Sequence, residues 1–199
     1  MLNLIKRSRR DRGDTIVEVL FSITVFSLLA VGSLSIMNQG TAAAQRSLEL
    51  TLVRQQIDSQ AEALRYMQAS YVSAVATSTT PADGSPAKEW QTIVTESIDG
   101  DATSFGTCDA PSSAFVVNTK TVKKYVGYSP ADTYARISYL PASVEIDKAA
   151  GIWVEAIRSK NFSGVSRYID FHIRACWYGP GLDQPMTTGT IVRLYEPTI

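Results

Sequence analysis

Hydrophobic positions follow three different spacings along the chain, and each spacing predicts a different kind of element. Residues 16–37 form a nearly unbroken apolar stretch. At about 1.5 Å of rise per residue, some twenty helical residues cross a hydrocarbon core of roughly 30 Å. The stretch therefore predicts a transmembrane helix. Its small polar side chains can bond back to helical carbonyls; they are Ser22, Thr24, Ser27, Ser33 and Ser35.

In residues 39–77, apolar side chains recur every three or four positions, which is the spacing of one helix face. No proline interrupts this segment, so we expect the transmembrane helix to continue as an amphipathic half, in one helix of about 60 residues. We expect a sheet to cover the apolar face, and a coiled-coil partner is the alternative. The face consists of Leu50, Val53, Ile57, Ala61, Leu64, Met67, Tyr71 and Val75.

After the helix, the pattern becomes that of short strands. Residues 77–86, TSTTPADGSP, are turn formers and predict the end of the helix. Residues 167–178 alternate strictly between apolar and polar positions, as in an antiparallel strand with one buried face. The candidate strands are residues 90–98, 114–119, 134–140, 152–158, 167–178 and 190–196. This order predicts an α+β fold, with a long N-terminal α-helix packed on a C-terminal antiparallel β-sheet.

Charge is distributed unevenly, although Lys+Arg and Asp+Glu both number 19. Without residues 1–13, which hold five basic and one acidic side chain, 14 basic and 18 acidic side chains remain. The mildly acidic remainder offers no basic face, so a nucleic-acid partner is not expected. Basic residues directly before an apolar span favour a cytoplasmic N-terminus and an exported C-terminal domain. The basic residues are Lys6, Arg7, Arg9, Arg10 and Arg12.

One charge lies inside the apolar stretch. Glu18 falls in the first turn of the predicted transmembrane helix. A charged side chain at the bilayer centre costs on the order of 3 kcal/mol on insertion scales, and less near the interface. Such a carboxylate is a candidate functional group, and it calls for a partner.

These N-terminal residues resemble the processing signal of type IV pilins and type II secretion pseudopilins. The match is Arg12-Gly13-Asp14-Thr15-Ile16-Val17-Glu18, followed by the apolar helix. The resemblance implies that a membrane peptidase cuts after Gly13 and methylates the new N-terminus at Asp14. Glu18 then becomes the fifth residue, which matches the family's glutamate. The family usually has phenylalanine or methionine after the cut, so Asp14 indicates a minor or variant subunit.

The resemblance also implies an organisation and a function. Residues 1–13 become a basic leader, 14–37 the transmembrane or filament-core helix, 38–78 the amphipathic half, and 79–199 the exported β-rich head. The expected function is a structural subunit of a type IV pilus or a type II secretion-like pseudopilus. Its partners would be other pilin subunits, the prepilin peptidase, an inner-membrane assembly platform with its ATPase, and the bilayer before assembly. After assembly the subunit would lie in a cell-surface filament.

Other interpretations stay open at this point. An ordinary secretory signal also has a basic start and an apolar core, and Ala30-Val31-Gly32 could serve as its cleavage site. A simple single-pass anchor would need no processing. A head with exposed aromatic residues could also be an adhesin or a DNA-uptake module, and Tyr125, Tyr128, Tyr134 and Tyr139 are the residues concerned.

Two cysteines, Cys108 and Cys176, favour one disulfide in an exported domain, and two free thiols are the alternative. Cys176 lies on the polar face of its strand, so the bond would hold the loop around Cys108 over the exposed face of the sheet. With His172 as the single histidine, no catalytic constellation, metal site or cofactor site is expected. Asp99-Gly100-Asp101 is read as a plain turn rather than a calcium loop. The sequence thus predicts a non-enzyme.

Overall fold

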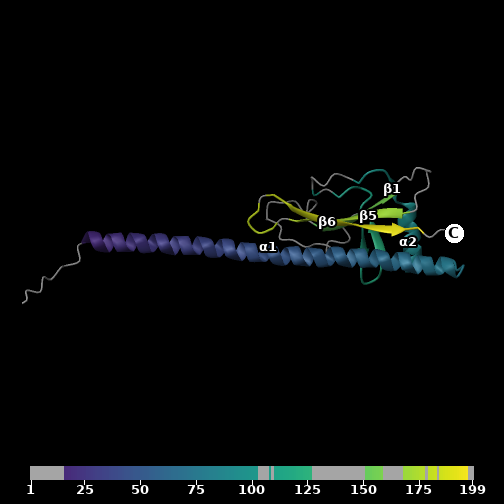
Figure 1. Cartoon of the computed structure of the whole chain (residues 1–199), viewed down its shortest axis with the longest axis horizontal. Helices are drawn as coiled ribbons and strands as arrows, with labels where there is room; N and C mark the ends of the chain where they lie inside the picture. The colour runs from purple at the N-terminus through teal and green to yellow at the C-terminus, as the bar shows by residue number, and fades with distance from the viewer. Residues whose placement is uncertain are drawn as a thin grey trace, which may run out of the picture. The chain divides into compact units, whose positions relative to one another are not determined.

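The computed structural model describes residues 16–102, 108, 110–126, 151–158, 168–177, 179–182 and 184–196 (Figure 1). The leader, the proposed cleavage site, residues 134–140 and three of the four tyrosines (Tyr128, Tyr134 and Tyr139) lie outside the described residues. The chain divides into two compact units, residues 1–44 and 45–199, and each is described by itself.

Helix α1 runs from Ile16 to Ala76, a length of 61 residues, which confirms the predicted long helix and its end. Its C-terminus is closed by a Schellman motif. Ser78 adopts a left-handed conformation with φ of 54°, its N–H bonds to the Val75 carbonyl at 3.0 Å, and the Thr79 N–H bonds to the Ala74 carbonyl at 2.9 Å. The last helical carbonyls are therefore satisfied, although no glycine is present at this end.

The second helix, α2 (Pro86–Thr95), is a correction to the sequence prediction of a strand at 90–98. Ser85 caps it, because the Ser85 hydroxyl accepts a bond from the Lys88 N–H at 3.3 Å, and Pro86 occupies its first position. Trp90 and Ile93, three residues apart, share its buried face. The Ser-Pro start and this spacing indicate a helix, whereas the prediction relied on the β-prone residue types alone.

The remaining structure is one sheet of six strands in the order β3-β2-β4-β5-β6, with β1 paired to β4. All pairs are antiparallel except the short β1–β4 pair, which is parallel. The fold is therefore α+β, as predicted. The strands are β1 (Ile98–Asp99), β2 (Phe115–Asn118), β3 (Lys123–Val126), β4 (Gly151–Arg158), β5 (Tyr168–Trp177) and β6 (Met186–Tyr195).

Four of these strands confirm predicted segments. β2, β4 and β5 lie within a residue of the expected bounds, and β6 begins at Met186, four residues earlier than expected. β3 was not predicted. Its residues, KKYV, offer too short and too charged a run to indicate a strand by pattern.

The core lies between the second half of α1, helix α2 and one face of the sheet. From α1 it takes the predicted apolar face, including Val53, Leu64 and Met67, each with 0% of its surface exposed. From β5 it takes the predicted apolar set, which is fully buried: Ile169, Phe171, Ile173, Ala175 and Trp177. The sheet is thus the partner of the helix face within the described residues, as expected, and no coiled-coil partner is needed to cover it.

Candidate functional site: the apolar half of helix α1 and the docked head

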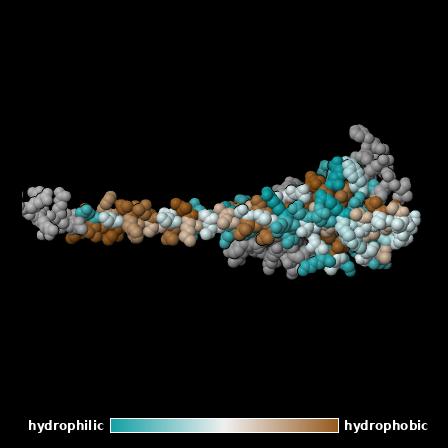
Figure 2. Space-filling view, turned by 60° about the horizontal axis from the view of Figure 1, so that its bottom comes forward, coloured by the Kyte–Doolittle hydropathy of each residue, from teal (hydrophilic) through white to brown (hydrophobic). Residues whose placement is uncertain are grey.

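The first part of α1 is apolar on all sides and open to its surroundings. Its large side chains are exposed, as for Phe26 at 72% and Leu29 at 65%. Brown side chains follow this part of the helix in Figure 2. The helix is long and apolar enough to cross a membrane. This half consequently has an apolar surface that the described part of its own chain does not cover.

Most hydroxyl side chains of this stretch are hydrogen-bonded to the backbone of their own helix. Ser22, Thr24, Ser27 and Ser33 each donate to the carbonyl four residues earlier, at 2.7 to 2.9 Å, as predicted from the sequence. Such bonds remove hydroxyl donors from an apolar environment and lower the cost of burying them. Ser35, the fifth predicted residue, makes no such bond.

Glu18 is the exception. It lies in the first turn of α1, is exposed, and its carboxylate has no side-chain partner among the described residues. The turn suits a negative charge, because the helix dipole is positive at this end. A carboxylate in this position can accept hydrogen bonds or pair with a cation that another molecule supplies.

The second half of α1 is docked by polar contacts that the sequence pattern does not reveal. Gln60 is 2% exposed, and its side-chain amide pairs with Val117 of β2 in both directions. Gln60 Nε2 donates to the Val117 carbonyl at 2.7 Å, and the Val117 N–H donates to Gln60 Oε1 at 2.8 Å. The amide takes the place that a neighbouring strand would take, since β2 is paired with β4 only at Phe115. The only signal in the sequence is a glutamine within an apolar stripe.

Two further contacts hold the start of this half to the head. Trp177 Nε1 donates to Glu49 Oε2 at 3.2 Å, and Arg46 Nε donates to the Pro180 carbonyl at 3.1 Å. Glu49 and Arg46 do not belong to the apolar face predicted from the sequence, and they are half-buried anchors rather than solvated charges.

The disulfide favoured by the sequence is present. Cys108 and Cys176 are bonded, with their Cα atoms 5.6 Å apart. The expectation that this bond lies over an exposed face is wrong, however. Cys176 is 0% exposed and packs with Ala114 and Trp153 in a second small core. The face is apolar at this end, because Trp153 of β4 shares it.

The polar face of β5 carries charges in cross-strand pairs. Asp170 accepts two bonds from Arg193 of β6 at 2.7 Å each, and the Arg193 guanidinium lies 4.0 Å from the Tyr168 ring centroid. Partial burial, followed by the nearby positive charge of Arg174, lowers the pKa of His172, while Asp170 opposes that shift. The imidazole of His172 is therefore harder to protonate in the folded head than in the unfolded chain.

The Asp99-Gly100-Asp101 segment begins at the end of the short strand β1. Asp99 and Asp101 flank Gly100, whose φ of 141° requires glycine. Within the described ranges, no group of three or more His, Cys, Asp or Glu side chains could hold a metal ion.

These features define an α+β protein with an N-terminal helix long and apolar enough to cross a membrane, continuous with a helix half docked on a disulfide-bonded sheet. No protein-family model matches the chain, and comparisons with curated proteins and with solved structures find no match either.

Proposed function

We propose that this chain is a structural subunit, minor or variant, of a type IV pilus or a type II secretion-like pseudopilus. The observation that carries the proposal is the exposed apolar half of α1 with a single carboxylate, Glu18, in its first turn. That half follows directly on a Gly13-Asp14 junction preceded by basic residues. A helix that is apolar on every side is suited first to lipid and then to a bundle of like helices.

In this proposal Glu18 orders the subunits. Cleavage after Gly13 frees an α-amino group at Asp14, and the amino group of a neighbouring subunit pairs with Glu18 inside the bundle. Such a buried pair fixes the register between helices more reliably than it adds net stability. The prepilin peptidase, an assembly platform and its ATPase would act on the cytoplasmic side, and the head would be exported.

The first test is the N-terminal mass of the chain recovered from its own cell membranes. We expect a chain that begins at Asp14, with or without a methyl group. Gly13→Val should leave the leader attached, because a branched side chain obstructs the peptidase. Gly32→Ala is the matched control: a Cβ at Gly32 meets nothing within 4 Å, so processing should be unchanged.

Other masses would contradict the proposal. A start near Ser33 would indicate an ordinary secreted protein, and an intact Met1 would indicate a simple anchor. If processing occurs, Glu18→Gln should abolish incorporation into filaments, whereas Glu62→Gln, which changes an exposed carboxylate on the amphipathic half, should not.

A further inference from the structure

The head contains an open pocket of about 570 Å³ between helix α2, the end of α1 and the end of β6. Its lining includes Tyr71 of α1, Glu196 directly after β6, and Gln91, Val94 and Thr95 of α2. Pockets that hold small molecules typically measure about 300 to 1,000 Å³. The size thus suits a ligand of one or two sugar-sized rings.

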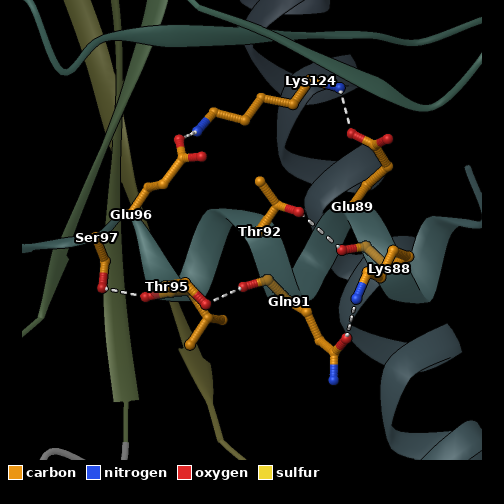
Figure 3. A network of polar contacts seen from close by, with 9 residues as sticks. Lys88, Glu89, Gln91, Thr92, Thr95, Glu96, Ser97 and Lys124 are labelled. Atoms are coloured by element: carbon orange, nitrogen blue, oxygen red, sulfur yellow. Dashed lines mark hydrogen bonds and ion pairs between the residues drawn. The ribbon is translucent and has the colours of Figure 1, made fainter. Parts of the chain in front are cut away.

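Several polar groups in this pocket can form further hydrogen bonds. Within the described part of the chain, the Tyr71 hydroxyl has no hydrogen-bond partner. Gln91 Oε1 accepts from Lys88 Nζ at 3.4 Å, but its amide nitrogen points away from the other labelled side chains in Figure 3 and makes no bond there. The hydroxyls of Thr92 and Thr95 donate to helical carbonyls, which leaves their oxygens able to accept.

The charged side chains around the pocket are largely paired with one another. Glu96 and Glu196 both line the pocket, and Lys88 is the one basic residue in its lining. The ammonium group of the nearby Lys124 is paired with Glu96 (Figure 3). Glu196 is likewise paired, with Arg158 at 3.4 Å. Lys88 is then the one lining cation without a carboxylate partner among the described residues, and its Nζ donates to Gln91 Oε1, so the pocket carries too little net charge to favour a strongly ionic ligand. A fully apolar ligand would leave these polar groups without partners, which is costly when water is displaced.

We propose that this pocket binds a neutral saccharide. Sugar hydroxyls would donate to the Glu196 carboxylate and accept from Gln91 Nε2 and the Tyr71 hydroxyl. The C–H face of the sugar ring would pack against the half-buried Tyr71 ring and Val94. This inference concerns the head alone, and it stands or falls independently of the processing and assembly of the chain.

The test uses the full chain in a zwitterionic detergent, because glucoside detergents would compete for the pocket. The probes are glucose, galactose, N-acetylglucosamine and their β-linked disaccharides. Binding is measured by tryptophan fluorescence, since Trp90 forms part of the pocket wall, and by ligand-observed NMR. The N-acetylated and plain sugars separate a cell-wall type of ligand from other glycans.

Variants locate the binding. Tyr71→Phe and Gln91→Ala should each weaken the affinity for the bound sugar by about tenfold or more. Tyr66→Ala and Gln55→Ala change the same residue types on exposed positions of α1 outside the pocket, and they should leave the affinity unchanged. Tyr71→Phe keeps the ring that packs on the core, so a loss of binding would not reflect unfolding. The proposal is overturned if no probe binds below about 10 mM, or if pocket and control variants bind alike.

Discussion

The two halves of helix α1 share one backbone conformation but bury their side chains in different ways. Residues 16–37 are apolar around the whole circumference and exposed, whereas residues 45–76 present one apolar face that the sheet and α2 cover. Where the apolar residues repeat with the helical period, the chain supplies its own partner. Where they occur on every side, no single sheet can cover them, and in the described part of the chain they stay exposed. Substitutions can test this difference directly.

The largest effect is expected in the docked half. Leu64→Ala removes a side chain that is 0% exposed, and it should lower the free energy of unfolding of the head by about 2 to 5 kcal/mol. Leu29→Ala, in the exposed half, should leave it unchanged. Urea unfolding of the full chain in detergent, followed by tryptophan fluorescence, measures both. Equal losses for the two variants would contradict the comparison.

Removal of the disulfide should be the next largest effect. Cys108 and Cys176 are 68 residues apart, and a cross-link of such a loop typically stabilises a domain by about 2 to 4 kcal/mol. Cys108→Ser should lower the free energy of unfolding of the head by that amount. The helix content of residues 16–37, which contain no cysteine, should persist under the same conditions by circular dichroism. Joint loss of both would show that the two halves unfold together.

A smaller loss is expected for Gln60→Leu. The substitution leaves the N–H and carbonyl of Val117 buried without their partner, which should cost about 1 to 3 kcal/mol. Gln55→Leu, on the exposed side of the same helix, is the control and should change stability by less than about 0.5 kcal/mol. If the two variants match, the amide pairing contributes nothing to docking.

The smallest effect concerns pH. The folded head lowers the pKa of His172, so the unfolded chain binds the proton more readily. Stability should be complete above the unfolded pKa, which is about 6.5, and should fall as pH decreases through that value. His172→Gln should flatten this part of the stability profile between about pH 7 and pH 5. An opposite slope in the wild-type chain, lost in the variant, would contradict the assigned direction.

The features that could be predicted from the sequence are those set by the periodic spacing of apolar residues. The spacing of apolar residues determines the length of α1, its buried face and the apolar face of β5, so these expectations are confirmed. The polar face of β5 is only partly exposed, because Arg174 and Cys176 on that face are buried. The contacts made by Gln60, Glu49 and Arg46 could not be predicted, because their partners lie 57, 128 and 134 residues away. Ser85 and Pro86 are a local signal for the start of helix α2. The β-prone residue types that follow nevertheless led to the prediction of a strand at 90–98.

For Glu18, too, one part could be predicted from the sequence and another part could not. The place of Glu18 at the head of the apolar helix follows from the sequence, and the structure puts it in the first turn. Its partner, and the fate of the Gly13-Asp14 junction, depend on other molecules. They stay predictions, since no feature within a single chain determines them.

The pairing of Gln60 with Val117 fixes the position of the helix along the sheet, because both hydrogen bonds form together or break together. Apolar contacts lose energy gradually when a helix slides, because each side chain finds other apolar neighbours. The two amide bonds share one residue on each side, so a shift of one turn, about 5.4 Å, breaks both at once. A pull along the helix axis would therefore meet little yielding before an abrupt release. In the filament that we propose, a head attached in this way would keep its place under tension up to a threshold force.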